Sequence, residues 1–188
     1  KDSMTPNDLL RAILTAEIDL LWFGGIGTYI KSTGENNVEV GDRTNDALRI
    51  NGNEVKARII GEGANLGTTQ LGRIEYALSG GRINTDFIDN SAGVGCSDHE
   101  VNIKILLNQV VANGDMTLKQ RNKLLASMTD EVTHLVLSHN YYQSQVLSIA
   151  NSRANMDLDN HIQLIHSLEK EGRLNRALEC LPDDITLA

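Results

Sequence analysis

Two loops made almost entirely of small residues constrain the fold of this chain more than any other feature. They run from Gly61 to Thr69 and from Asn90 to Ser97, and apart from Leu66 they carry no bulky apolar side chain. Each loop follows an apolar or alternating run and precedes a helical pattern. Each is therefore predicted to lie at the carboxyl end of a strand, where open α/β sheets bind ligands. Small residues let a ligand approach the backbone, and one Asn in each loop offers both a donor and an acceptor. The pattern predicts a site for a nucleotide or a small polar substrate.

The chain is predicted to be α/β up to about residue 97 and helical afterwards. Apolar runs predict strands within 18–23, 55–60 and 82–88, and Asn51-Gly52 predicts a tight hairpin turn. Helix starts are predicted at Thr5-Pro6, at Thr68 or Thr69, and at Thr117 with Gln120, because these residues suit N-capping. A further helix is predicted to begin at Asp98. This division gives an α/β domain over 1–97 and a helical extension over 98–188.

None of the glycine pairs completes a dinucleotide-binding fingerprint. The pattern G-x-G-x-x-G needs a third glycine, and Ile30, Leu66 and Asp98 stand at that position after the three candidate pairs. The pairs are Gly25-x-Gly27, Gly61-x-Gly63 and Gly93-x-Gly95. A glycine pair alone is a weak signal that a plain turn also explains.

Composition argues against several classes of function. The net charge is −8 with no basic stripe, which disfavours nucleic acid, and the apolar runs are too short to span a bilayer. Two widely separated cysteines suggest a reducing compartment, so we expect a cytoplasmic protein. Cys96 and His99 lack a second pair of ligands, so no metal site is expected. Both ends of the sequence look cut, and we expect a fragment of a larger protein.

The two loops and their flanks resemble the glutamate dehydrogenase family of amino-acid dehydrogenases. The family carries an EGAN-x-x-TT loop and an N-A-G-G-V-x-x-S loop, which are similar to GEGANLGTT and NSAGVGCS here. The runs LLWFGGIGTYIKS, RIIGEGANLG, GRINTDFIDNSAGVGCSDHEVNIKILL and LEKEGRLNRALECLPDD resemble the large NAD-specific bacterial members. The resemblance covers most of the chain. It implies a partial Rossmann-like cofactor domain with three layers (αβα), followed by helices.

The resemblance also implies an activity and a set of contacts. The family oxidatively deaminates L-glutamate to 2-oxoglutarate and ammonia and passes a hydride to NAD. Asn65 is implied to contact the nicotinamide end of the cofactor, with Gly63 in the same loop. Asn90 is implied to bind near the nicotinamide ribose or amide, and Ser97 to hold the side-chain carboxylate of glutamate. The remaining cofactor contacts are expected at Gly24 and Gly25.

The chain also departs from the family pattern. Ser91 and Ala92 replace the usual Ala and Gly of the second loop, although small size is kept. The family's acid-base lysines and aspartate, and its pyrophosphate fingerprint, lie upstream and have no counterpart in this sequence. We therefore expect no catalytic residue in the chain and no activity from it alone. The missing N-terminal portions of the same subunit are the expected partners, and the complete enzyme is expected to be a homo-oligomer.

Several alternatives remain open at the level of sequence. Ser97 is a good N-cap for the helix predicted from Asp98, and this role is compatible with carboxylate binding. The substrate could instead be a branched-chain or aromatic amino acid. A third interpretation is a non-catalytic interaction or regulatory module, in which helices over about 117–181 dock onto other parts of a large subunit. That module predicts an uncovered apolar face on those helices.

Overall fold

The structure of the chain is a computed structural model that describes residues 3–187. The chain forms two compact units. One is made of the residues up to Asp86 together with those from Ile149 onward, and the other is Phe87–Ser148. The predicted domain boundary after residue 97 concerns the organisation of a larger protein and stays a prediction.

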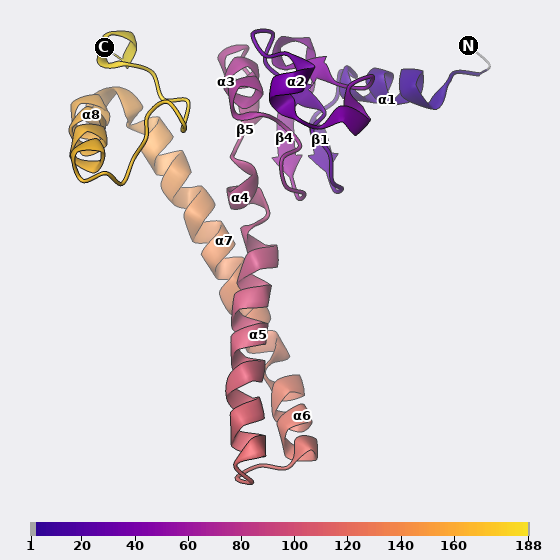
Figure 1. The fold of residues 1–188 in the computed structure, drawn as a ribbon, viewed down its shortest axis with the longest axis vertical. Helices are drawn as coiled ribbons and strands as arrows, with labels where there is room; N and C mark the ends of the chain where they lie inside the picture. Colours follow the sequence, from indigo (N-terminus) through magenta and orange to yellow (C-terminus); the bar gives the residue numbers. More distant parts are fainter. Residues whose placement is uncertain (1–2, 188) are drawn as a thin grey trace. The chain divides into compact units, whose positions relative to one another are not determined.

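The first unit contains two small parallel sheets. Strands β1 (Leu20–Phe23), β4 (Ile59–Glu62) and β5 (Arg82–Ile83) form one sheet in the order β1-β4-β5. Strands β2 (Ile30–Lys31) and β3 (Ile50–Asn51) form the other. Helix α1 (Pro6–Leu14) precedes the strands. The helices and turns between them are α2 (Asn37–Val40), the 3-10 turns Arg43–Asn45 and Gly52–Glu54, and α3 (Gln70–Leu78) (Figure 1). This confirms the α/β class with helices for the first part of the chain.

A compact apolar core holds these elements together. Along β1, Leu21 and Phe23 are buried while Leu20 and Trp22 are exposed, the alternation of a strand covered on one face. Tyr76 of α3 is buried and its hydroxyl donates to the carbonyl oxygen of Ala57 at 2.7 Å. The core residues are Leu14, Leu21, Phe23, Ile30, Ile50, Ala57, Ile60 and Tyr76. Each large apolar side chain buried here stabilises the fold by about 1.5–3 kcal/mol.

The hairpin predicted at Asn51-Gly52 is wrong. Strand β3 pairs in parallel with β2, with Ile30 opposite Ile50, and Gly52 begins a 3-10 turn. Gly52 lies under α3, where an added Cβ would sit 2.5 Å from the carbonyl oxygen of Gly72. The glycine therefore permits a close approach of backbones and does not supply the positive φ of a hairpin turn.

The second unit is helical. It contains α5 (Ser91–Ala112), α6 (Leu118–Ser127) and most of α7 (Thr129–Ser152), and α4 (Asp86–Asp89) precedes α5. The hydroxyl of Thr117 accepts from the N–H of Gln120, which confirms the predicted start of α6. The strand predicted over 82–88 is shorter than expected, because β5 ends at Ile83 and α4 begins at Asp86.

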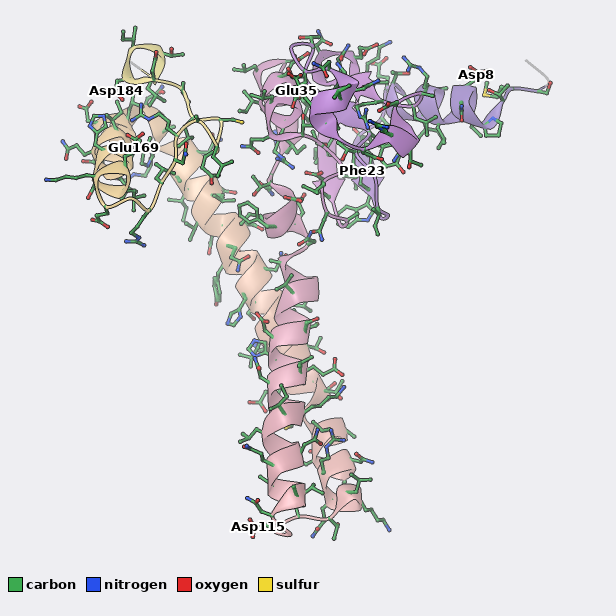
Figure 2. The ribbon with its side chains drawn as sticks, in the orientation of Figure 1. Asp8, Phe23, Glu35, Asp115, Glu169 and Asp184 are labelled. Carbon is green, nitrogen blue, oxygen red and sulfur yellow. The ribbon has the colours of Figure 1, made fainter. Side chains whose placement is uncertain are left out.

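The last elements are α8 (Ala154–Lys170) and α9 (Asp184–Leu187). Arg176 joins them, because its guanidinium contacts Glu169 at 3.0 Å and Asp184 at 2.7 Å; both carboxylates are labelled in Figure 2. Within residues 3–187, the helices are too short or too polar to cross a bilayer.

Candidate functional site at the carboxyl edge of the sheet

The parallel register of β1 and β4 brings two of the predicted loops together. Phe23, labelled in Figure 2, lies opposite Glu62 at the carboxyl ends of the two strands. Gly24 and Gly25 therefore emerge beside Gly63. The N–H of Ala64 donates to the carbonyl oxygen of Phe23 at 3.0 Å, which fixes the two loop starts to each other.

The loop residues at this edge are small and exposed. Gly24, Gly25, Gly63 and Asn65 are all exposed, and a Cβ built on Gly25 would meet nothing within 4 Å. The backbone of both loops is therefore accessible to a ligand at the edge where open α/β sheets bind nucleotides and small substrates.

Trp22 explains part of the glycine content of this edge. Its indole lies against Gly61 and Gly63, where a Cβ on Gly61 would be 2.5 Å from the ring and one on Gly63 closer still. The indole is nevertheless 58% exposed. Glycine at both positions is thus required for the close approach of the ring, whatever further role Gly63 has.

A buried ion pair lies directly beneath the Gly63–Gly67 loop. Glu62 is fully buried, and its carboxylate accepts from Arg73 Nη2 at 2.6 Å and from the N–H of Thr68 at 2.9 Å. Arg73 comes from α3 and also donates to Gln70 at 2.6 Å. Burial raises the pKa of Glu62, and the hydrogen bond from Arg73 acts in the opposite direction. Both ends of the loop are thereby attached to one carboxylate.

A second buried arginine organises the loop that follows β1. Arg49 donates from Nε to the carbonyl oxygen of Thr28 at 2.9 Å and from Nη1 to Asp46 at 2.7 Å. Asp42 accepts from the N–H of Thr28 at 2.9 Å, and the hydrogen bond from Asn45 is the main cause that lowers the pKa of this carboxyl. Asp42 and Asp46 therefore form an ion-pair network with Arg49.

The surface excursion after β2 is tied to the start of α3. Glu35, labelled in Figure 2, accepts from the hydroxyl of Thr69 at 2.6 Å and from the N–H of Ser32 at 2.7 Å. Thr69 also caps α3, because its hydroxyl accepts from the N–H of Gly72. Of the two threonines considered from the sequence, Thr69 is the cap.

The second predicted loop, Asn90–Ser97, is not a loop. Asn90 directly precedes α5, and Ser97 lies inside that helix with its side chain exposed, so Ser97 is not an N-cap. Small residues suggested a loop, but Ser, Ala and Val extend a helix once its hydrogen bonds are propagated. A Cβ on Gly95 would lie 3.7 Å from Val136 of α7, so the glycine faces a buried contact between helices.

The start of α5 is held from α7. Asn140 donates from Nδ2 to the carbonyl oxygen of Ile88 at 3.0 Å and to the hydroxyl of Ser91 at 2.8 Å. Nothing in the sequence pattern identified Asn140, because its partners lie about fifty positions earlier in the chain. Asn90 and Ser97 belong to this helical unit, whereas Asn65 and the glycines belong to the other.

Other candidate groups lie away from the sheet edge. Cys96 is a free, exposed thiol, and the ring of His99 lies 5.8 Å from that of His139. In the described part of the chain, no three His, Cys, Asp or Glu residues are grouped as metal ligands would be. A surface hollow lined by Lys56, Tyr76 and Arg82 lies at the amino ends of β4 and β5, at the opposite edge of the sheet.

Comparisons with known proteins identify the family of this chain. Residues 1–150 match the model of the catalytic domain of bacterial NAD-glutamate dehydrogenase. The chain is 57% identical over its whole length to a Pseudomonas aeruginosa protein named NAD-specific glutamate dehydrogenase. It is 55% and 53% identical, over 98% of its length, to proteins of the same name from Halomonas elongata and Mycobacterium tuberculosis. The chain spans only 12% of the first relative's length and 11% of the others'. With a family match over most of its residues, the chain belongs to the bacterial NAD-glutamate dehydrogenases and represents a segment of their catalytic domain.

Proposed function

We propose that this chain forms one wall of the cofactor cleft in an NAD-dependent glutamate dehydrogenase, an enzyme that oxidatively deaminates L-glutamate to 2-oxoglutarate and ammonia. One observation carries the proposal: the β1 and β4 register sets Gly24-Gly25 beside Gly63-Ala64-Asn65 at the carboxyl edge of a parallel sheet. NAD supplies the hydride acceptor, and the protein supplies orientation and exclusion of water.

The residues at this edge fit the nicotinamide end of such a cofactor. Gly24, Gly25 and Gly63 are exposed, and the space beside Gly25 is open, so a flat ring and its ribose can approach closely there; Trp22 lies against the other side of this edge at Gly63. Asn65 carries a side-chain amide that both donates and accepts, matching the carboxamide of nicotinamide. In this proposal Asn65 orients the ring, and the glycines make room for it.

The helical unit contributes two further proposed contacts. Asn90, directly before α5, binds near the nicotinamide ribose or amide. Ser97, whose hydroxyl is exposed on α5, donates to the side-chain carboxylate of glutamate. The groups that move protons during deamination come from other parts of the polypeptide, and this chain supplies none of them.

The sheet is proposed to be part of a larger Rossmann-like domain with three layers. Its strands are all parallel in the order β1-β4-β5, and one face leaves Leu20, Trp22 and Ile59 exposed for a further layer. Residues 1–97 then form part of the dinucleotide-binding domain, and 98–188 form the helical extension. The complete enzyme is proposed to be a cytoplasmic homo-oligomer.

The test is a substitution in the complete protein. Asn65→Ala is expected to raise the KM for NAD by about 10-fold, because two hydrogen bonds to the carboxamide are lost. Asn53→Ala is the matched control, since Asn53 is exposed on the 3-10 turn before β4, away from the carboxyl edge. If Asn65→Ala and Asn53→Ala give the same KM for NAD as the parent, the cofactor role of Asn65 is wrong.

A second role has its own observation. The helices after residue 117 leave large apolar side chains exposed, which is the feature that the interaction-module interpretation predicts. Examples are Tyr141, Tyr142, Val146 and Leu164. Because the chain spans about a tenth of its relatives' length, we propose that other segments of the same polypeptide cover these side chains. This docking role is compatible with the dehydrogenase role.

A further inference from the structure

The loop that carries Asn65 contains an unusual backbone conformation. Leu66 has φ = 60°, one of two positive φ values at non-glycine positions between residues 3 and 187. A leucine in this left-handed region is strained by about 1–2 kcal/mol, so the surrounding structure must hold it there. Since Leu66 follows Asn65 directly, the same constraint fixes the direction of the Asn65 peptide.

Asp86 supplies that constraint. Its Oδ2 accepts from the N–H of Leu66 at 2.9 Å, across twenty positions of sequence. Its Oδ1 lies 4.0 Å from Arg73 Nη2, the same nitrogen that donates to Glu62. The Asp86 side chain is only 16% exposed, so its charge is partly removed from solvent. Asp86 therefore connects the tip of the loop to the buried pair beneath it.

The position of Asp86 shows that it does more than begin a helix. It is the first residue of α4, a helix of only four residues, yet its carboxylate accepts from Leu66 in the loop. Four positions later the chain reaches Asn90, the second proposed cofactor contact. The Asp86 carboxylate thus joins the Asn65 loop to the first residue of α4.

We propose that Asp86 is a positioning residue for the nicotinamide cofactor: by holding Leu66 in the left-handed conformation, it presents the Asn65 amide to the ring. Arg73 and Glu62 support this arrangement from below. The inference rests on the proposed cofactor role of Asn65 and adds to it the residue that keeps the loop in its binding conformation. A loop that adopts this conformation only part of the time binds its ligand more weakly by the same fraction.

The test measures steady-state kinetics in the complete protein with Asp86→Ala and Asp86→Asn. Asp86→Ala is expected to raise the KM for NAD by about 10-fold and to leave the KM for glutamate within twofold. Asp86→Asn keeps an oxygen that accepts from the N–H of Leu66, so it is expected to raise the KM for NAD less than Asp86→Ala does. Asp19→Asn is the matched control, because Asp19 pairs with Arg58 at the amino end of β1 and its side chain is 85% exposed.

A double variant separates positioning from general stability. If Asp86 acts through Asn65, the Asn65→Ala, Asp86→Ala protein has the same KM for NAD as Asn65→Ala alone, within twofold. Hydrogen exchange in the peptide covering 63–68 is expected to be faster in Asp86→Ala than in the parent. Two outcomes would overturn the positioning role while leaving the cofactor role of Asn65 intact. One is a KM for NAD in the double variant that equals the product of the two single effects. The other is an unchanged KM in Asp86→Ala together with a raised KM in Asn65→Ala. An unchanged KM in Asn65→Ala would overturn the cofactor role and this proposal with it.

Discussion

Arg73 is the residue on which the loop after β4 depends most directly. Its guanidinium satisfies a fully buried carboxylate and also donates to the carbonyl oxygen of Thr68 at 3.3 Å. Removing one partner of a buried pair leaves the other charge without compensation, which is far more costly than losing a pair on the surface. Removing either member of this pair alone is therefore expected to destabilise the loop much more than removing a member of an exposed pair.

Arg73→Met is expected to lower the free energy of unfolding by about 3–5 kcal/mol near neutral pH. Without Arg73, the hydrogen bond from the N–H of Thr68 opposes the effect of burial with no nearby positive charge, so the raised pKa of Glu62 rises further above its ordinary 4.5. Between the ordinary pKa of 4.5 and the raised pKa in the folded protein, the folded state holds more protons than the unfolded state. The free energy of unfolding therefore falls as pH rises through this window. The loss is therefore smallest below the window and largest above it, as measured by urea unfolding followed by circular dichroism.

The matched control is Arg58→Met. Arg58 pairs with Asp19 at 2.9 Å, but both side chains are at least 80% exposed, so a change below about 1 kcal/mol is expected at every pH. A pH-independent loss in Arg73→Met would show that the Glu62 carboxylate is not the group left uncompensated.

At the scale of elements, the beginning of α5 is the clearest departure from the sequence pattern. Gly93 and Gly95 lie within a helix of 22 residues, although glycine is the poorest helix former after proline. Gly95 has a packing reason in its contact with Val136, whereas a Cβ on Gly93 would meet nothing within 4 Å. The helix therefore includes Gly93 although glycine disfavours helix formation and no close neighbour requires a glycine there.

Gly93→Ala is expected to stabilise the helical unit by about 0.5–1 kcal/mol, because alanine restricts the unfolded chain and fits the helix. Gly114→Ala is the matched comparison. Gly114 follows α5 with φ = 82° and open space around it, so alanine there is expected to destabilise by about 1 kcal/mol through backbone strain alone. Urea unfolding measures both; a destabilised Gly93→Ala would contradict an unobstructed helical position for Gly93.

The elements also show what sequence alone could predict. The caps at Thr5, Thr69 and Thr117 were predictable, because a capping side chain and its N–H partner lie three positions apart. The end of β1 was predictable from an apolar run that stops at Gly24, whereas β4 continues through Gly61 to Glu62, two residues past the end of its apolar run. The Asn90–Ser97 loop and the Asn51-Gly52 hairpin failed, because small residues were interpreted by local preference while packing against α7 and α3 determined their conformation.

The supporting residues of the site could not be predicted for a different reason. Arg73, Asp86 and Asn140 act on partners 11, 20 and about fifty positions away, and a buried arginine looks like any other charged helix residue in sequence. Motif resemblance predicts which residues face a ligand. The residues that hold the loop in place emerge only when distant segments are brought together.

At the scale of the whole molecule, the chain is a segment of a longer protein family that leaves large apolar side chains exposed. One face of β1 and β4 leaves apolar side chains exposed, as does α7. In the Pseudomonas aeruginosa relative, the matched segment is only 12% of the polypeptide. Both faces are suited to contacts within one subunit.

Hydroxyl-radical labelling of Tyr141 and Tyr142, which are 62% and 60% exposed, tests whether other segments of the polypeptide cover α7. Labelling of both is expected to fall several-fold in the complete protein relative to the isolated chain, because other segments cover α7. Tyr76, which is 1% exposed, serves as an internal control that stays unlabelled in both. Equal labelling of Tyr141 and Tyr142 in the two samples would contradict the docking role.

The contact of Trp22 with Gly61 and Gly63 has an optical consequence. Trp22 is the single tryptophan of the chain, and its ring lies against the strand that leads to Asn65. Indole emission overlaps the absorption of a reduced nicotinamide, so energy transfer between them depends steeply on their separation. The chain therefore carries its own intrinsic fluorophore at the proposed cofactor edge, and the colour and intensity of its emission report on that edge without any added label.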